Sequence, residues 1–116
     1  MATRSLLATK INDVYGVIYC HYDGYPEHHS PILVDHYSDE KMVQKLILAG
    51  NIRSLESSFD ELSFYGEPPV DTYNIREMEQ MFLGSECVYL YLFSNGEWSY
   101  TKKQLPLKWV PCVKKE

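Results

Sequence analysis

The side chains that could carry out chemistry are concentrated in one stretch, Tyr19 to His29, with the sequence YCHYDGYPEHH. Within it, His21, Asp23 and His28 combine imidazole and carboxylate groups of the kind that bind zinc or another divalent ion. None of the HxxxH, HxH or HExxH spacings is present. The alternative is a structural turn, in which Asp23 accepts hydrogen bonds from nearby backbone N–H groups. We favour the turn, and therefore predict no metal ligand, no catalytic residue and no cofactor.

The same stretch also predicts a corner that binds an anion. Arg4, at the start of the first expected strand, would lie opposite the end of the second, close to His21 and Tyr22. A helix expected just beyond the turn would add free backbone N–H groups and the positive end of its dipole. With Asp23 and Tyr25, these residues indicate a site for a phosphorylated or nucleotide ligand. The alternative is that Arg4 pairs with Asp23 or with a surface glutamate.

A C-terminal hairpin over residues 87–103 supplies a second candidate surface. Its strands are joined by Asn95-Gly96, a typical two-residue hairpin turn, which fixes the register of the pairing. One face of the hairpin then carries only aromatic side chains: Tyr89, Tyr91, Phe93, Trp98 and Tyr100. Such a face is either a core layer or an exposed platform for a base or a partner protein. In the second case Tyr91, Trp98 and Tyr100 are the ligand-binding candidates.

Turn residues and apolar spacing predict the elements that position these side chains. A hairpin over residues 5–22, with Asn12-Asp13 as its turn, opens the chain. A first helix begins between Pro26 and Ser30-Pro31, because Ser before Pro suits a helix start, and ends near Ser38.

The next two helices have clearer signals. Residues 40–49 have a helical apolar spacing and are followed by Gly50, a typical helix stop. Residues 75–83 follow Asn74, a favourable N-cap. Between them, residues 51–73 contain Gly and Pro residues that break any long element. We predict a loop there with room for one short helical turn, and a loop of this length in a small domain is often functional.

Together these elements predict a single domain over residues 1–116. The expected fold class is α+β, with an antiparallel sheet of about four strands from the N- and C-terminal hairpins and about three helices on one face. The tail contains Pro106 and Pro111, and we expect it to lie along the domain as an edge strand or extended cover anchored by Trp109.

Composition excludes several classes of function. The net charge of −5 argues against generic nucleic-acid binding, which needs an excess of Lys and Arg. The longest apolar stretch is far too short to span a membrane. The cysteines, Cys20, Cys87 and Cys112, form no CxxC pair, and no signal-peptide pattern is present. These features favour a reducing cytosol.

Several segments carry a resemblance that covers most of the chain: Ala2-Thr3-Arg4-Ser5, Tyr19 to Pro26, Asp35 to Asp39, Lys45 to Leu55, and Tyr91 to Trp98. On these segments the chain resembles a family of small proteins encoded by tailed bacteriophages and prophages. The family's central run is typically Y-C-H-W-D-G-Y-P, and Tyr22 stands here in the place of the Trp. His28-His29-Ser30 replaces a more Gly-rich stretch. The resemblance implies a phage accessory protein made in the host bacterial cytoplasm, and it supplies no catalytic residues.

From these observations we expect a non-catalytic binding protein that acts in counter-defence or host takeover. It would bind a host protein or a small anionic ligand such as a nucleotide, and it could form a homo-oligomer that covers exposed aromatic side chains. The alternative from another class is a metal-assisted hydrolase of a phosphorylated small molecule, using His21, Asp23 and His28. A third hypothesis is a structural protein of the virion.

Overall fold

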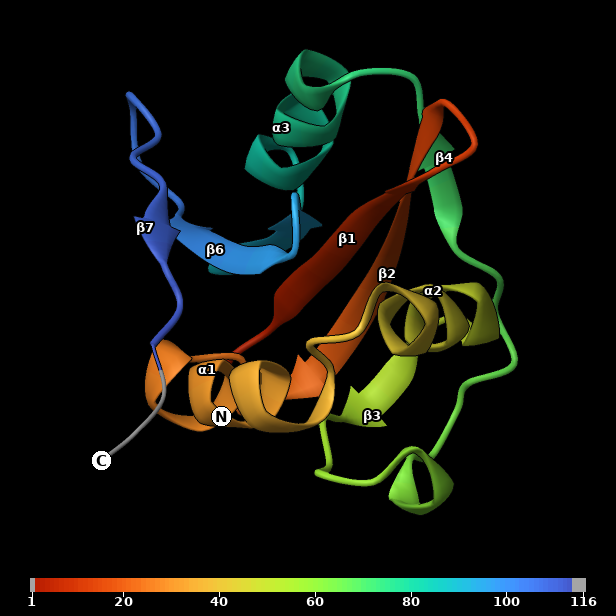
Figure 1. Cartoon of the computed structure of the whole chain (residues 1–116). Coiled ribbons are helices and arrows are strands. Elements are labelled where there is room, and N and C mark those ends of the chain that lie inside the picture. Colours follow the sequence, from red (N-terminus) through yellow and green to blue (C-terminus); the bar gives the residue numbers. More distant parts are fainter. Residues whose placement is uncertain (1, 114–116) are drawn as a thin grey trace.

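The chain is built around one mixed β-sheet with helices on both faces, as the computed structural model shows for residues 2–113 (Figure 1). The strands are β1 (Ser5–Ile11), β2 (Val14–Tyr22), β3 (Ile52–Ser54), β4 (Val70–Thr72), β5 (Tyr89–Ser94), β6 (Glu97–Lys102) and β7 (Val110–Pro111). The helices are α1 (Pro26–His36), α2 (Glu40–Ala49) and α3 (Ile75–Leu83), with a 3₁₀ turn, η1 (Phe59–Glu61). The α+β class is confirmed.

The sheet is larger than predicted and is not purely antiparallel. Its seven strands, within residues 2–113, follow the order β3-β2-β1-β5-β6-β7, and β4 also pairs with β2. Both predicted hairpins are present, but they meet through a parallel pairing of β1 with β5. A second parallel pair joins β2 and β3. Hairpin pairing is local and visible in sequence, whereas the β1–β5 pairing joins Ser5 to Tyr89 and depends on the path of the whole chain.

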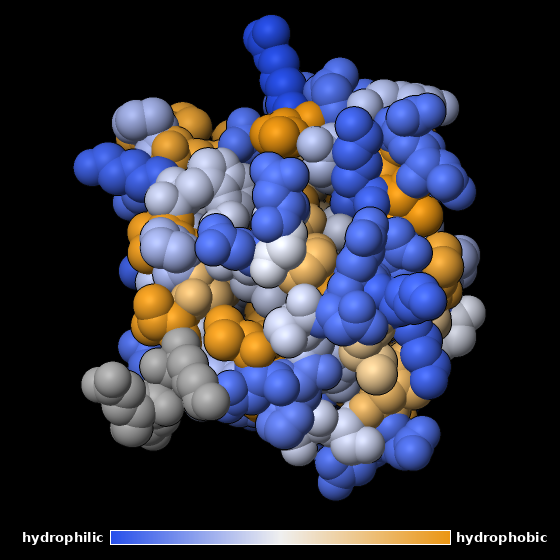
Figure 2. All heavy atoms as spheres, in the orientation of Figure 1, coloured by the Kyte–Doolittle hydropathy of each residue, from blue (hydrophilic) through white to orange (hydrophobic). Residues whose placement is uncertain are grey.

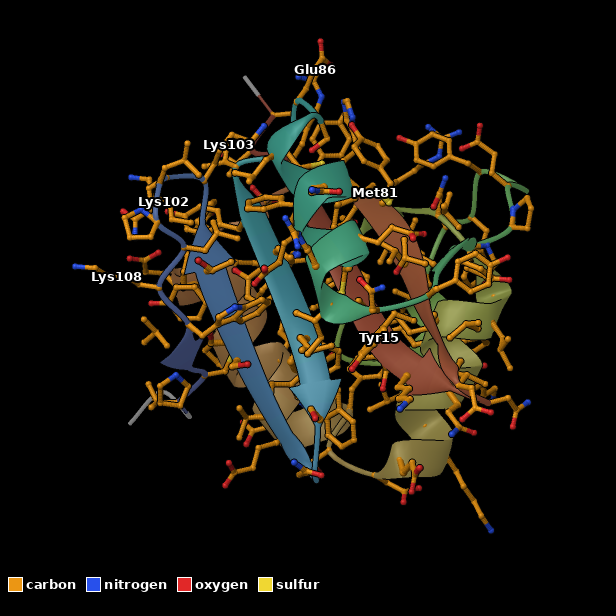
Figure 3. All side chains as sticks on the ribbon, turned by 90° about the horizontal axis from the view of Figure 1, so that it is seen from above. Tyr15, Met81, Glu86, Lys102, Lys103 and Lys108 are labelled. Atoms are coloured by element: carbon orange, nitrogen blue, oxygen red, sulfur yellow. The ribbon has the colours of Figure 1, made fainter. Side chains whose placement is uncertain are left out.

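The helices cover both faces of the sheet, so the prediction of three helices on one face is wrong. On one face, α1 and α2 pack over Leu7, Ile18 and other buried side chains of the central strands. On the other, Met78 and Phe82 of α3 pack over Leu6, Ala8, Val17, Leu90 and Leu92. Figure 3 shows α3 crossing this second face. The central strands are apolar on both sides, and each side therefore needs a covering layer.

The aromatic face of the C-terminal hairpin is a core layer. Its register is the predicted one, with Phe93 opposite Trp98 and Tyr91 opposite Tyr100. Tyr91, Phe93 and Trp98 are buried beneath α1 and α2. The Tyr91 hydroxyl donates a hydrogen bond to the carbonyl of Gly24 at 2.6 Å. A ligand in solution therefore has no access to Tyr91 in this fold.

Trp98 is held in the same way. Its indole Nε1 donates a hydrogen bond to the carbonyl of Tyr37 at 2.8 Å, and the side chain is 3% exposed. Of the three aromatic candidates, only Tyr100 is partly accessible. The hypothesis of an exposed platform is wrong because α1 and α2 cover the aromatic face of the C-terminal hairpin.

The helix bounds agree with prediction except at α1. The second and third helices match the expected ranges, and α3 has the expected cap, with Asn74 accepting a hydrogen bond from the Glu77 N–H. The first helix begins at Pro26, with Tyr25 as its N-cap, and ends at His36. Ser30-Pro31 therefore lies inside the helix instead of starting it. Proline at the first helical position is favourable because its missing N–H would have had no partner within the helix.

The segments predicted as loop and tail contain short strands. β3 and β4, of three residues each, extend the outer edge of β2. β7 pairs with β6 as an edge strand, which confirms the expected course of the tail. Trp109 anchors it from the α3 side, where its indole Nε1 donates to Glu79 Oε2 at 3.0 Å. Strands this short have too few residues for an alternating pattern.

Candidate functional site

The turn between β2 and α1 is shaped by a close approach of two backbone segments. Asp23 adopts a positive φ of 56°, and the N–H of Gly24 donates to the carbonyl of Thr3 at 2.8 Å. A Cβ at position 24 would lie 2.7 Å from that oxygen and 2.7 Å from the Cβ of Ser5. Only glycine fits there, and the first turn of α1 is held against the start of β1 as a result.

A buried chain of polar side chains lies behind this turn. His29 Nε2 is 3.1 Å from Ser5 Oγ, and His29 Nδ1 is 3.0 Å from His28 Nδ1. Burial, together with the neighbouring His28, lowers the pKa of His29 to about 3. His29 is therefore neutral at physiological pH, and one of the two facing Nδ1 atoms must carry a hydrogen and the other accept it. Ser5 and His29 are fully buried, so this network of polar side chains has a structural role.

The predicted anion corner is divided between the two faces of the sheet. Arg4 and His21 lie on the α3 face with Tyr19, whose hydroxyl is 2.6 Å from His21 Nδ1. Burial raises the pKa of Tyr19, and a hydrogen bond from Arg4 partly opposes that shift. Arg4 also lies 3.8 Å from Glu86 in an exposed ion pair, as the alternative hypothesis anticipated. The ring of Tyr22 meets that of His21 edge-on at 4.5 Å.

Tyr19, which contacts both Arg4 and His21, lines a hollow of about 300 Å³ on the α3 face. Its walls include Tyr19, Cys87 and Met81 of α3, and Glu86 lies at its rim. Figure 3 shows Met81 and Glu86 on the side of the molecule that α3 covers. The structure thus brings Arg4, His21 and Tyr22 together, with Tyr19 as a link that sequence reasoning missed.

The start of α1 does not join this cluster. Pro26 has no N–H, and the N–H groups of His28 and His29 both donate to the carbonyl of Tyr25. Glu27 adds a negative charge to the first turn. Asp23 and Tyr25 are exposed, and α1 packs on the opposite face from Arg4. The N–H groups of His28 and His29 are therefore not free to bind an anion at this helix end.

The side chains considered as metal ligands have separate partners. His21 bonds to Tyr19, and His28 bonds to His29. Within residues 2–113, no three His, Cys, Asp or Glu side chains come together as a metal ion would require. The geometry therefore gives no support to the hydrolase alternative that used His21, Asp23 and His28.

A mainly apolar hollow of about 450 Å³ lies between the first two turns of α1 and the β6–β7 edge. We call it the α1 groove. It is lined by Pro26, Glu27, Ser30, Pro31, Tyr100, Val110, Pro111 and Val113. Figure 2 shows some hydrophobic atoms exposed at the left of the molecule, near the place of α1 and β7 in Figure 1. An apolar hollow of this size with a few polar groups is typical of a binding site.

The floor of the α1 groove carries an unsatisfied polar atom. Ser30 is 4% exposed, and its Oγ has no hydrogen-bond partner. The Cys112 thiol is close enough to Ser30 for the hydroxyl to lower its pKa, although no hydrogen bond of good geometry forms. Burial is the larger effect and raises the pKa of Cys112 to about 11. Because this oxygen has almost no exposed surface where it lies, the Ser30 side chain must rotate toward the groove for a ligand to supply the missing partner.

The outer wall of the α1 groove also borders a neighbouring hollow. A second hollow of about 220 Å³ shares Pro111 with the first and is lined by Val34 and Ser38 further along the chain, and by Glu97 and Trp98 of β6. Sequence reasoning missed the groove, apart from Tyr100, because its outer wall depends on where the tail docks. The one available signal was the apolar and proline-containing stretch around Val110 and Pro111 in a tail otherwise rich in Lys.

Another hollow, of about 650 Å³, lies between the two hairpin turns and the start of α2, and its lining is mainly polar. Within residues 2–113 it shows no buried polar atom that lacks a partner, in contrast to the α1 groove.

Among the described residues, none of the helices has the length and apolar character needed to cross a bilayer. No family model, curated protein or solved structure matches this chain.

Proposed function

We propose that this chain is a non-catalytic binding protein whose α1 groove receives part of a partner protein. In the phage setting that the sequence resemblance implies, the partner is a host protein in the infected bacterial cytoplasm, and binding serves counter-defence or host takeover. The observation that carries the proposal is the apolar hollow of about 450 Å³ with the buried, unpartnered Ser30 hydroxyl on its floor. Apolar hollows with one or two polar anchors are typical of recognition surfaces.

The reactive side chains support binding over catalysis. Burial raises the pKa of Cys20 to about 12 and of Cys112 to about 11, and it also raises the pKa of Cys87. These thiols are therefore poor nucleophiles, since the thiolate is the reactive form. Ser5, which contacts His29, is fully buried and has no access to a substrate.

A pair of matched valines tests the proposal. Val110, 42% exposed, lines the α1 groove, whereas Val70, 49% exposed, lies in the short strand β4 away from it. We expect Val110→Arg to lose a host protein that the wild type retains from infected-cell lysate, and Val70→Arg to keep it. Native mass spectrometry measures retention, and thermal unfolding followed by circular dichroism checks that both variants fold.

Either of two results would contradict the proposal. Val110→Arg could retain the same host protein as the wild type while remaining folded, which would place the contact elsewhere. Alternatively, the wild type could retain no protein at all from infected-cell lysate.

A second candidate function is the binding of a small phosphorylated ligand on the α3 face. It is favoured by the link that joins Arg4 and His21 through the Tyr19 hydroxyl beside a hollow of about 300 Å³. Guanidinium and imidazole groups that flank a hydroxyl offer several donors to a phosphate. We expect inorganic phosphate to shift the NMR signals of Tyr19 and His21, and Arg4→Gln to abolish that shift. Arg53→Gln, whose guanidinium lies over Tyr65, is the matched control, and equal shifts in both variants would exclude this site.

A further inference from the structure

The α1 groove has a definite chemical preference at its floor. A buried hydroxyl without a partner is unfavourable, and a ligand group that hydrogen-bonds to Ser30 Oγ removes that penalty. The walls around it are three proline rings and the ring of Tyr100. Flat, rigid apolar walls of this kind suit an aromatic ring, which also loses little side-chain entropy on binding. The groove therefore suits an aromatic side chain with a polar tip, namely Tyr or Trp.

The rim of the groove has a preference of its own. Glu27 lines the large hollow and Glu97 the small one, and both side chains are exposed. None of the described residues that line either hollow carries a positive charge. The rim therefore favours a cation and disfavours a carboxylate or phosphate.

The length of the groove distinguishes a peptide from a small molecule. The groove and the neighbouring hollow lie along α1, whose 11 residues correspond to roughly 16 Å at the rise of a helix. An extended chain of about five or six residues covers that distance. On the outer wall, Pro111 has no N–H to offer the occupant, so the groove would hold it by side chains more than by strand pairing.

We propose that the α1 groove binds an extended peptide segment of a partner protein, with a Tyr or Trp side chain that hydrogen-bonds to Ser30 and a neighbouring Lys or Arg that meets Glu27. This inference rests on the proposed function and names the chemistry of the segment that docks.

The probe is a capped peptide, acetyl-Ser-Tyr-Ser-Lys-Ser-amide, with relatives that carry Phe or Leu in place of Tyr, or Glu in place of Lys. NMR titration of the isotope-labelled full chain measures weak affinities and locates the contact by the signals of Ser30, Tyr100 and Val110. We expect the Tyr peptide to bind the wild type about fivefold tighter than the Phe peptide, and Ser30→Ala to remove that difference. The Lys peptide should bind about threefold tighter than the Glu peptide, with the preference lost in Glu27→Gln and weakened by salt.

Glu40→Gln, an exposed carboxylate on α2, is the matched control and should keep the preference for Lys. A preference for Tyr that survives Ser30→Ala, or a preference for Lys that survives Glu27→Gln, overturns the inference. Absence of binding by every peptide, or binding that shifts only signals outside the groove, also overturns it. If Val110→Arg abolishes retention of a host protein, the proposed function is supported even when the peptide inference is overturned. The proposed function and the peptide inference can therefore fail separately.

Discussion

At the scale of single residues, His29 links the fold to pH. Its imidazole is buried against Ser5, His28 and the ring of Tyr91. Burial lowers its pKa to about 3, from an ordinary value of about 6.5 in the unfolded chain. The unfolded state therefore binds the extra proton more readily than the folded state. Stability from this group is present above pH ~6.5 and is lost as pH falls toward 3.

We therefore expect the free energy of unfolding to fall steeply with acid, by up to roughly 5 kcal/mol from this group alone. His29→Gln, which cannot take up the proton, should be less stable near neutral pH but should lose less stability between pH 6.5 and 4. Urea unfolding at a series of pH values measures both quantities. The exposed His36→Gln is the control, and a wild-type slope in His29→Gln would show that other groups cause the acid sensitivity.

Residue types predicted which strand residues pair, but they did not predict which of those side chains are buried and which are exposed. The turn Asn95-Gly96 was enough to place Tyr91 opposite Tyr100. It could not show that Tyr91 is covered by α1 while Tyr100 borders a groove, because both facts depend on helices and a tail from elsewhere in the chain. The position of Ser30 before Pro31 predicts a helix start, whereas in the structure Ser30 lies inside α1 and lines a hollow.

At the scale of elements, the caps of α2 and α3 provide a matched comparison. Asn74 accepts a hydrogen bond from the Glu77 N–H at 2.8 Å, whereas Asp39, the N-cap of α2, forms no side-chain cap bond. We expect Asn74→Ala to lower the free energy of unfolding by about 1 kcal/mol and Asp39→Ala by clearly less. Urea unfolding of both variants measures the difference, and an equal loss in the two would mean that the Asn74 bond contributes no stability of its own.

The elements that sequence predicted are those with strong local signals. Both hairpins have a two-residue turn with positive φ at Asn12, Asp13, Asn95 and Gly96, and α2 ends at a glycine with positive φ. α1 was less certain because it offers two possible starts, and the choice of Pro26 is supported by the tight contact of Gly24 with Thr3. β3 and β4 lack such local signals, and both pair with the outer edge of β2.

At the scale of the whole molecule, β1 and β5 join two hairpins into one sheet, and their side chains contribute to both core layers. Sequence predicted the hairpins, but it predicted neither their parallel junction nor the division of α1, α2 and α3 between the two faces. The α1 groove also arises only at this scale, because one wall is α1 and the other is the β6–β7 edge, far apart in the chain. Burial of Tyr91 and Trp98 removes the reason for which we expected a homo-oligomer.

The shared central strands predict that the two core layers unfold together. The two tryptophans of the chain report on different layers: Trp98 is buried beneath α1 and α2, and Trp109 packs on the α3 side. Leu6, Leu7 and their neighbours in β1 point alternately into each layer, so loss of one layer exposes the strand that supports the other.

We therefore expect Trp109→Phe, observed through Trp98, and Trp98→Phe, observed through Trp109, each to unfold in a single transition. In each variant the fluorescence midpoint in urea should coincide with the midpoint from far-UV circular dichroism. Comparison within one variant removes the effect of the substitution on stability. A Trp109 signal that changes at lower urea than the circular dichroism would mean that the α3 layer and the tail separate first. In that case the outer wall of the α1 groove would open without global unfolding, since β7 belongs to the same tail as Trp109.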